Sequence, residues 1–290
     1  MSTETPNVEA VASSRKHRAK ARLYLALKLL CGGLGVADFG WFAISFNNAE
    51  YFQAFAAFVC VGPLSGAYAG FDHRWVENRF YWAHRLSVAE SLARMAAEKD
   101  WNYCVVLRPF KLDAEVQMNN DFNPFRFLPV GFGMPMVDVQ EWLMRSAGVT
   151  WRFLVAVDRE KGLSTGHIRG AYVELGSDWL EDVRKLVRAA DVIVFVPGGT
   201  PGIGQELELI LKERPHHTVI LFPRQQGNER LYKQIDTLAS LDPYRPLVPR
   251  KGAIILPLKD DADAMHLQAY PLTPTSARKV LKARSGAQID

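Results

Sequence analysis

The chain has 290 residues, of which 48% are hydrophobic and 23% charged, a composition that favours a folded protein and argues against a largely disordered one. Its net charge of +4, without a basic stripe interleaved with aromatic residues, argues against a nucleic-acid partner. The three cysteines have no CxxC or Cys/His ligand spacing, so we expect a reduced protein without a bound metal.

The N-terminal part is predicted to carry a disordered basic tail, 1–22, and then a transmembrane helical hairpin, 23–75. The apolar stretches Leu23 to Phe46 and Tyr51 to Phe71 are each long enough to cross a bilayer core of about 30 Å at about 1.5 Å per residue. Lysine and arginine flank both outer ends but not the short link. The positive-inside rule therefore predicts two spans in the inner (plasma) membrane, with both termini in the cytoplasm. A cleaved signal peptide is the alternative for the first stretch.

Small residues recur on one face of the second predicted span, at Gly62, Gly66 and Gly70. Such spacing lets helix backbones approach closely. We expect this face to pack on the first helix or on a partner chain, and we expect a homo-oligomer through the membrane hairpin. Asp38, within the first span, either has a function or pairs across an oligomer.

An amphipathic juxtamembrane helix, 76–100, is predicted to lead into a cytoplasmic domain, 101–260. A polar C-terminal tail, 261–290, follows, with one basic helix expected over Ser276 to Arg284. Within the domain, short apolar strands alternate with helical patterns. The expected strands are Tyr103 to Leu107, Arg152 to Val157, Asp191 to Val196, Thr218 to Phe222 and Ala253 to Leu258. This alternation predicts an α/β fold with an open, doubly wound, mostly parallel five-stranded sheet of the flavodoxin-like type. The aperiodic insert 114–136 is either a lid or a surface loop.

The third predicted strand leads through a glycine-rich turn into a helix, in the run DVIVFVPGGTPGIGQELEL from Asp191 to Leu209. Ligands of such sheets bind at the carboxyl ends of the strands, and the N–H groups at a helix start favour phosphate. The predicted phosphate-binding residues are Gly198, Gly199, Thr200, Gly202 and Gly204, with Arg108 and Lys111 as cationic partners. The alternatives are a strand-to-helix connection without a ligand and, for the two cations, ion pairs with Asp113 or Asp158.

Glu206 lies about one turn into this predicted helix. There a carboxylate can reach a ribose or interact with the helix's own N-terminus. It is the only carboxylate that the sequence places well for catalysis, and no second acid accompanies it for two-carboxylate glycoside chemistry.

The run DWLEDVRKLVRAADVIVFVPGGTPGIGQEL, residues 178–207, resembles the second half of TIR domains. In that family, a Trp-led helix, an apolar strand and a serine-rich turn lead to a helix with a glutamate six residues after the serine. Thr200 and Glu206 have this spacing, whereas Gly202 and Ile203 replace the usual Trp and Cys. The resemblance implies cleavage of the nicotinamide–ribose bond of NAD, supported by Glu206.

The segment PGGTPGIGQE also resembles the PGGxGTxxE turn of the LOG and Smf nucleotide-binding group (SLOG), with one extra residue before Glu206. Together with LRPFKLD, residues 107–113, the 178–207 run is similar to a set of bacterial hairpin-anchored proteins. These resemblances imply a membrane-anchored domain with a signalling or defence role that takes NAD or another adenine nucleotide as ligand or substrate and requires no cofactor. The alternatives are a non-catalytic nucleotide sensor or protein-interaction module, and a purely structural domain.

Overall fold

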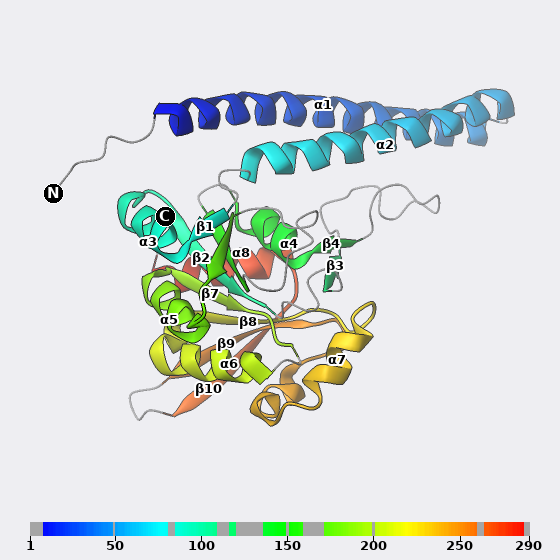
Figure 1. Cartoon of the computed structure of the whole chain (residues 1–290). Helices are drawn as coiled ribbons and strands as arrows, with labels where there is room; N and C mark the ends of the chain where they lie inside the picture. The colour runs from blue at the N-terminus through cyan, green and yellow to red at the C-terminus, as the bar shows by residue number, and fades with distance from the viewer. Residues whose placement is uncertain are drawn as a thin grey trace. The chain divides into compact units, whose positions relative to one another are not determined.

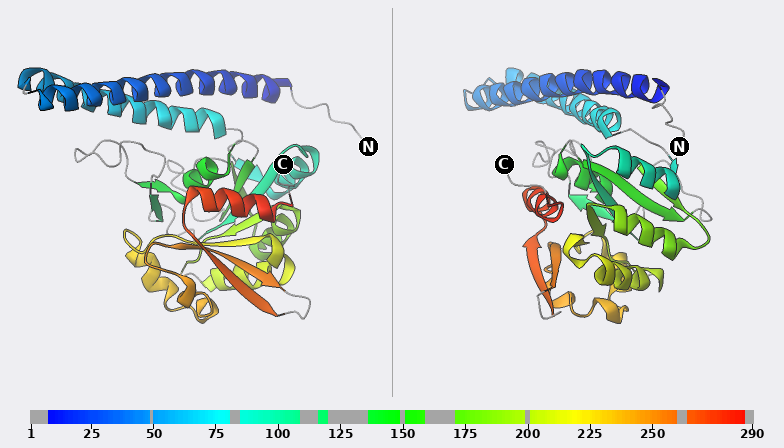
Figure 2. Two further views of the ribbon diagram at one scale, coloured as in Figure 1. Left: turned by 180° about the vertical axis from the view of Figure 1, so that it is seen from behind. Right: turned by 90° about the vertical axis from the view of Figure 1, so that its left-hand side faces the viewer.

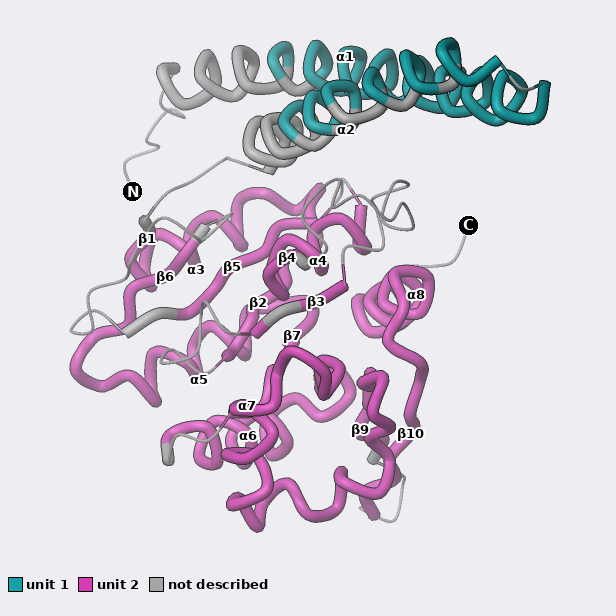
Figure 3. Tube along the Cα trace, turned by 90° about the vertical axis from the view of Figure 1, so that its right-hand side faces the viewer, with its two compact units in different colours: residues 1–82, 120–135 teal, residues 83–119, 136–290 magenta. Residues whose placement is uncertain are grey.

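The computed structural model describes residues 8–48, 50–80, 85–108, 116–119, 136–148, 151–158, 171–198, 201–259 and 264–286 (Figure 1). The chain divides into two compact units, coloured separately in Figure 3. One unit comprises residues 1–82 and 120–135, and the other comprises residues 83–119 and 136–290.

The first unit contains a helical hairpin of α1 (Val8–Asn47) and α2 (Tyr51–Phe80), which lie side by side in every view (Figures 1 and 2). The backbone closes the end of α1 through two hydrogen bonds. The N–H of Asn48 donates to the carbonyl of Ile44 at 3.0 Å, and the N–H of Glu50 donates to that of Ser45 at 2.8 Å. The chain therefore reverses within a few residues, at the polar link that the sequence indicated.

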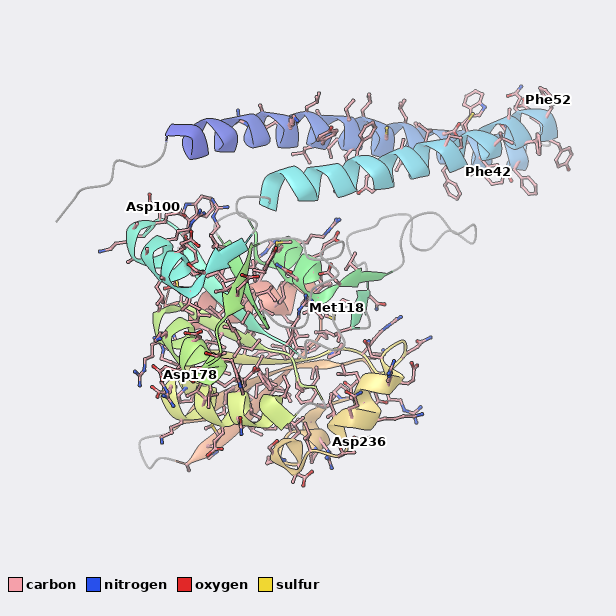
Figure 4. The ribbon with its side chains drawn as sticks, in the orientation of Figure 1. Phe42, Phe52, Asp100, Met118, Asp178 and Asp236 are labelled. Atoms are coloured by element: carbon pink, nitrogen blue, oxygen red, sulfur yellow. The ribbon has the colours of Figure 1, made fainter. Side chains whose placement is uncertain are left out.

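Large apolar side chains are exposed along this hairpin (Figure 4), including Val36 at 65% and Phe52 at 83%. Among the described helices, the stretch Arg22–Asn47 of α1 is long and apolar enough to cross a membrane, as judged by length and composition. The length and composition of α1 therefore support the first of the two predicted spans. The crossing of α2 and the orientation of the termini stay predictions.

The glycine face of α2 does not pack on α1 where the structure describes it. A Cβ added at Gly66 or Gly70 would have no neighbour within 4 Å, other than adjacent residues and the helix backbone. The close approach instead involves α1, where a Cβ on Gly32 would lie 3.3 Å from the ring of Tyr68. Of the two partners expected for this face, the first helix is therefore not the one at Gly66 and Gly70, because the buried side of α2 carries Ala57 and Tyr68. Packing on a partner chain stays a prediction.

The second unit is built on an eight-stranded sheet in the order β1-β6-β5-β2-β7-β8-β9-β10. Its strands are β1 (Arg85–Ser87), β2 (Asn102–Leu107), β5 (Trp151–Asp158), β6 (Ala171–Leu175), β7 (Val192–Phe195), β8 (Thr218–Phe222), β9 (Ala253–Lys259) and β10 (Met265–Pro271). In this sheet order, each strand from β1 through β8 is parallel to its neighbour, whereas β9 is antiparallel to both β8 and β10. The mostly parallel α/β sheet is confirmed. The count of five strands is too low among the described residues, and β9 runs antiparallel.

Helices cover both faces of this sheet (Figure 2). On one face α3 (Val88–Ala97), α5 (Trp179–Ala189) and α6 (Pro201–Glu213) pack in sequence, and on the other α4 (Val139–Ala147) packs on α8 (Pro274–Arg284). The short helix α7 (Glu229–Ile235) follows β8, and β3 (Gln117–Asn119) pairs with β4 (Met136–Asp138) in a separate two-stranded ladder. All described residues of β7 and β8 are buried, so the core lies along these central strands.

Two predicted segments differ from the structure. The single helix expected over 76–100 is interrupted, since β1 and a new helix, α3, follow α2. Ser87 caps α3, because its Oγ accepts from the Glu90 N–H at 3.2 Å while the Glu90 carboxylate accepts from the Ser87 N–H at 2.7 Å. The polar tail, 261–290, contains the expected basic helix as α8, and it also contributes the strand β10, which the sequence did not predict. Arg284 fastens α8 by donating to the carbonyls of His216 at 2.6 Å and Pro257 at 2.8 Å.

Gly252 directly precedes β9, in a tight turn whose requirement for glycine can be tested. Its φ is +82°, and an added Cβ would lie 2.6 Å from the carbonyl oxygen of Phe222. We expect Gly252→Ala to lower the free energy of unfolding by about 2 kcal/mol or more, because left-handed strain and a backbone clash add. Denaturant unfolding measures the change. Gly286→Ala is the control, since φ there is +68° and no described neighbour lies within 4 Å. Equal losses at both positions would contradict the steric cause.

Candidate nucleotide site at the carboxyl ends of the strands

The strand order places a topological switch point between β2 and β7. After β2 the chain forms β5 and β6 on one side, and then crosses to add β7 and β8 on the other side. Without the short edge strand β1, the parallel strands from β6 to β8 therefore read 3-2-1-4-5, the order of dinucleotide-binding sheets. The five strands that the sequence predicted do not include β6. In the sheet these five read 2-1-3-4-5, the flavodoxin-like order. Both descriptions place the ligand crevice outside the carboxyl ends of β2 and β7.

Arg108 directly follows β2 at this switch point. Leu107 is paired with Phe195, and the N–H of Val196 donates to the Leu107 carbonyl at 2.8 Å. Arg108 and Val196 are therefore the first residues after the two paired strand ends. Arg108 is 3% exposed, so its side chain is buried within the α/β unit. Lys111, the second cation that the sequence predicted, lies outside the described residues.

The glycine-rich turn is shorter than the sequence predicted. Val196, Pro197 and Gly198 are buried after β7, and α6 begins at Pro201, so Gly202 and Gly204 lie within the first turns of the helix. Proline suits this first helical position because it lacks the N–H that would have no partner there.

Both helical glycines have protein neighbours. A Cβ on Gly202 would lie 3.3 Å from the Trp179 ring at the start of α5, and one on Gly204 would lie 3.7 Å from the Ser240 Oγ. Gly202 therefore lets Trp179 approach closely, which is a packing role. The remaining predicted turn residues, Gly199 and Thr200, lie outside the described residues.

Glu206 lies on the buried side of α6. Ile203, Leu207 and Ile210 share this helical stripe and are each at most 2% exposed, and Glu206 itself is 3% exposed. Its Oε2 atom has no hydrogen-bond partner within the described part of the chain. Burial raises the pKa of the Glu206 carboxyl to about 8, so much of it is protonated at neutral pH. A neutral carboxyl can donate as well as accept a hydrogen bond, which an ordinary surface glutamate cannot do.

The end of β8 adds an ordered polar segment beside β7. The Tyr232 hydroxyl donates to the carbonyl of Pro223 at 2.6 Å, and the Asn228 amide donates to the carbonyl of Arg224 at 2.9 Å. These bonds hold the chain where it leaves the sheet. Arg224 is half-buried there, so a second arginine follows a central strand.

The sequence did not identify Gln140, a buried amide in the first turn of α4. It is 1% exposed, and among the described residues neither its Oε1 nor its Nε2 has a hydrogen-bond partner. The signal was its position on the helical stripe with Leu143, Met144 and Ala147, all buried. Within the part of the chain that the structure describes, no three His, Cys, Asp or Glu side chains form a metal-binding group.

Comparisons of the chain with protein-family models, with curated proteins and with solved structures found no match. The resemblances to TIR domains and to the LOG and Smf group therefore rest on the motif residues alone.

The buried carboxyl of Glu206 predicts that the free energy of unfolding depends on pH. In the unfolded chain the group ionises near pH 4.5, whereas the folded protein keeps it protonated up to about pH 8. The free energy of unfolding should therefore fall as the pH rises from about 4.5 to about 8, by a few kcal/mol at most. Glu206→Gln should remove this component, and denaturant unfolding of the full-length protein in detergent at pH 5 and pH 9 measures it.

The control for that experiment is Glu208→Gln, since Glu208 is an exposed acid on the same helix. We expect this substitution to leave the pH dependence unchanged. The same pH dependence in wild type and Glu206→Gln would mean that the Glu206 carboxylate has a favourable partner in the folded protein.

Proposed function

We propose that the α/β unit binds an adenine nucleotide at the carboxyl ends of β2 and β7, and that it hydrolyses the nicotinamide–ribose bond of NAD. The observation that carries this proposal is the buried carboxyl of Glu206, on the helix that follows β7. Its Oε2 atom lacks a hydrogen-bond partner among the residues that the structure describes. Buried polar groups without partners are uncommon and concentrate at functional sites. The dinucleotide-type strand order supports a nucleotide as the ligand.

Each group has a chemical role in this proposal. The N–H groups at the start of α6 and the guanidinium of Arg108 meet the phosphates, because both offer donors with positive charge or dipole. Glu206 orients the ribose hydroxyls and stabilises the oxocarbenium-like centre that develops as nicotinamide leaves. Water then adds to the ribose. Glu206 suits this role best in its ionised form, so binding must favour loss of its proton.

A nucleotide sensor without turnover is the second candidate, and the burial of Glu206 favours it. A carboxyl that is 3% exposed must be uncovered before it can contact a substrate. The sensor needs only the phosphate contacts, whereas the enzyme also needs Glu206. We propose a signalling or defence role for the domain in either case.

The first functional test follows NAD consumption and nicotinamide release by the full-length protein in detergent. We expect turnover by wild type and by Glu208→Gln, and a loss of at least about 100-fold in Glu206→Gln, the order of magnitude that one positioned electrostatic or proton-transfer group contributes.

Thermal unfolding with NAD, ATP and AMP separates the two candidates. A ligand that binds the folded state raises the melting temperature. Stabilisation without turnover would support the sensor. Neither stabilisation nor turnover, with any of the three nucleotides, would contradict the proposed site.

We further propose that α1 and α2 form a two-span anchor in the inner membrane, with both termini in the cytoplasm. The exposed apolar surface of the hairpin and the absence of Lys and Arg from its short link support this orientation. Lipid is thus the proposed partner of the hairpin. The open faces of Gly66 and Gly70 support a homo-oligomer in which a second copy approaches α2.

Thiol labelling tests this orientation in intact cells, with Cys31 and Cys60 replaced by alanine. We expect a membrane-impermeant maleimide to label Asn48→Cys, at the link between the helices, because the link faces away from the cytoplasm. Lys279→Cys, on an exposed position of α8, should react only after permeabilisation. Labelling of both positions only after permeabilisation would exclude a hairpin that crosses the membrane.

A further inference from the structure

Apart from Pro271 at its end, the edge strand β10 lacks the features that keep sheet edges from pairing. It is the last strand of the sheet, and its seven residues pair with β9 without a bulge, from Met265↔Lys259 to Pro271↔Ala253. The sequence of β10, MHLQAYP, contains no Lys, Arg, Asp or Glu. Edge strands that stay unpaired are usually short, charged, bulged or covered.

The other edge of the sheet shows the usual protection. β1 has three residues and pairs parallel with β6, so it offers little backbone to another chain. In β10, by contrast, Met265, Gln268 and Ala269 are exposed, and Figure 2 shows the strand at the margin of the sheet. Among described large apolar side chains outside the hairpin, Met265 is the one that is clearly exposed, at 40%.

We propose that β10 pairs antiparallel with β10 of a second copy of this chain, so that one sheet continues across a two-fold axis near Gln268. Self-pairing about this residue places Leu267 opposite Ala269 and Met265 opposite Pro271, so that apolar side chains meet on one face. Gln268 lies opposite its own copy on the other face, where two amides can hydrogen-bond. No pair brings like charges together, because the strand has none.

A second copy fits this edge better than a partner of different sequence. An isologous contact needs a surface that is complementary to itself, and an uncharged strand meets this condition when it pairs antiparallel. A charged partner strand would find no opposite charge in β10. One strand pair is smaller than a standard stable interface, so the pairing needs the raised local concentration that a shared membrane or hairpin contact supplies. This inference depends on the fold and not on the proposed nucleotide chemistry.

Site-specific crosslinking of the full-length protein in detergent tests the pairing and its direction. In a background with Cys31 and Cys60 replaced by alanine, Gln268→Cys should give a covalent dimer with a short bismaleimide, because opposite Cβ atoms lie about 5 Å apart. Met265→Cys alone should give several-fold less dimer, since the two copies of this residue lie about 20 Å apart at about 3.4 Å per residue. Mixing Met265→Cys chains with Pro271→Cys chains should restore the dimer.

Glu208→Cys, at an exposed position of α6, is the control for chains that associate only through the hairpin. Its dimer yield should stay several-fold below that of Gln268→Cys. Equal yields from Gln268→Cys and Glu208→Cys would overturn the proposal, and so would failure of the mixed Met265→Cys and Pro271→Cys chains to crosslink. Efficient dimerisation of Met265→Cys alone would indicate a parallel contact, which also contradicts the two-fold pairing.

Discussion

The pairing of β2 with β7 is the constraint on which the α/β unit depends. Both strands are buried, so their backbone groups must find partners within the sheet. Hydrogen bonds beyond the ladder fix the register at each end. At one end the Tyr103 N–H donates to the Asp191 carboxylate at 2.7 Å, and the Asp191 N–H donates to the Tyr103 carbonyl at 3.0 Å. At the other end Val196 donates to Leu107. This register places Arg108 beside the turn that leads into α6.

Sequence patterns predicted the buried and amphipathic elements well. β7 and β8 are continuous apolar runs. Asp178, labelled in Figure 4, caps α5, because its Oδ1 accepts from the Glu181 N–H at 3.4 Å. Among the missed strands, β6 has an alternating pattern, with Val173 and Leu175 buried, whereas β10 lacks such a signal. Both faces of β10 are largely exposed, so its side chains do not alternate between core and solvent. The interruption before α3 did have a signal, since Ser87 and Glu90 have capping-box spacing.

The candidate site was predictable in position but not in detail. Alternating strands and helices indicated that a ligand would bind where β7 ends, and the sheet order agrees with that position. The sequence did not reveal where α6 begins. Because Pro201 starts the helix, Gly202 became a packing residue against Trp179 and not part of the turn. Spacing did carry a signal that Glu206 is turned toward the buried side of its helix, since Ile203, Leu207 and Ile210 share its helical stripe.

The energetic consequence of that orientation connects stability with binding. An apolar side chain at position 206 would complete the buried stripe of α6, whereas a carboxyl there loses its hydration without a hydrogen bond to Oε2 in return. A ligand that hydrogen-bonds to Oε2 supplies the missing partner and removes part of this destabilisation. A ligand group that donates to the carboxylate, such as a ribose hydroxyl, also lowers its pKa and releases a proton. The same residue that weakens the unliganded fold thereby strengthens the binding of a ligand with donors in that position.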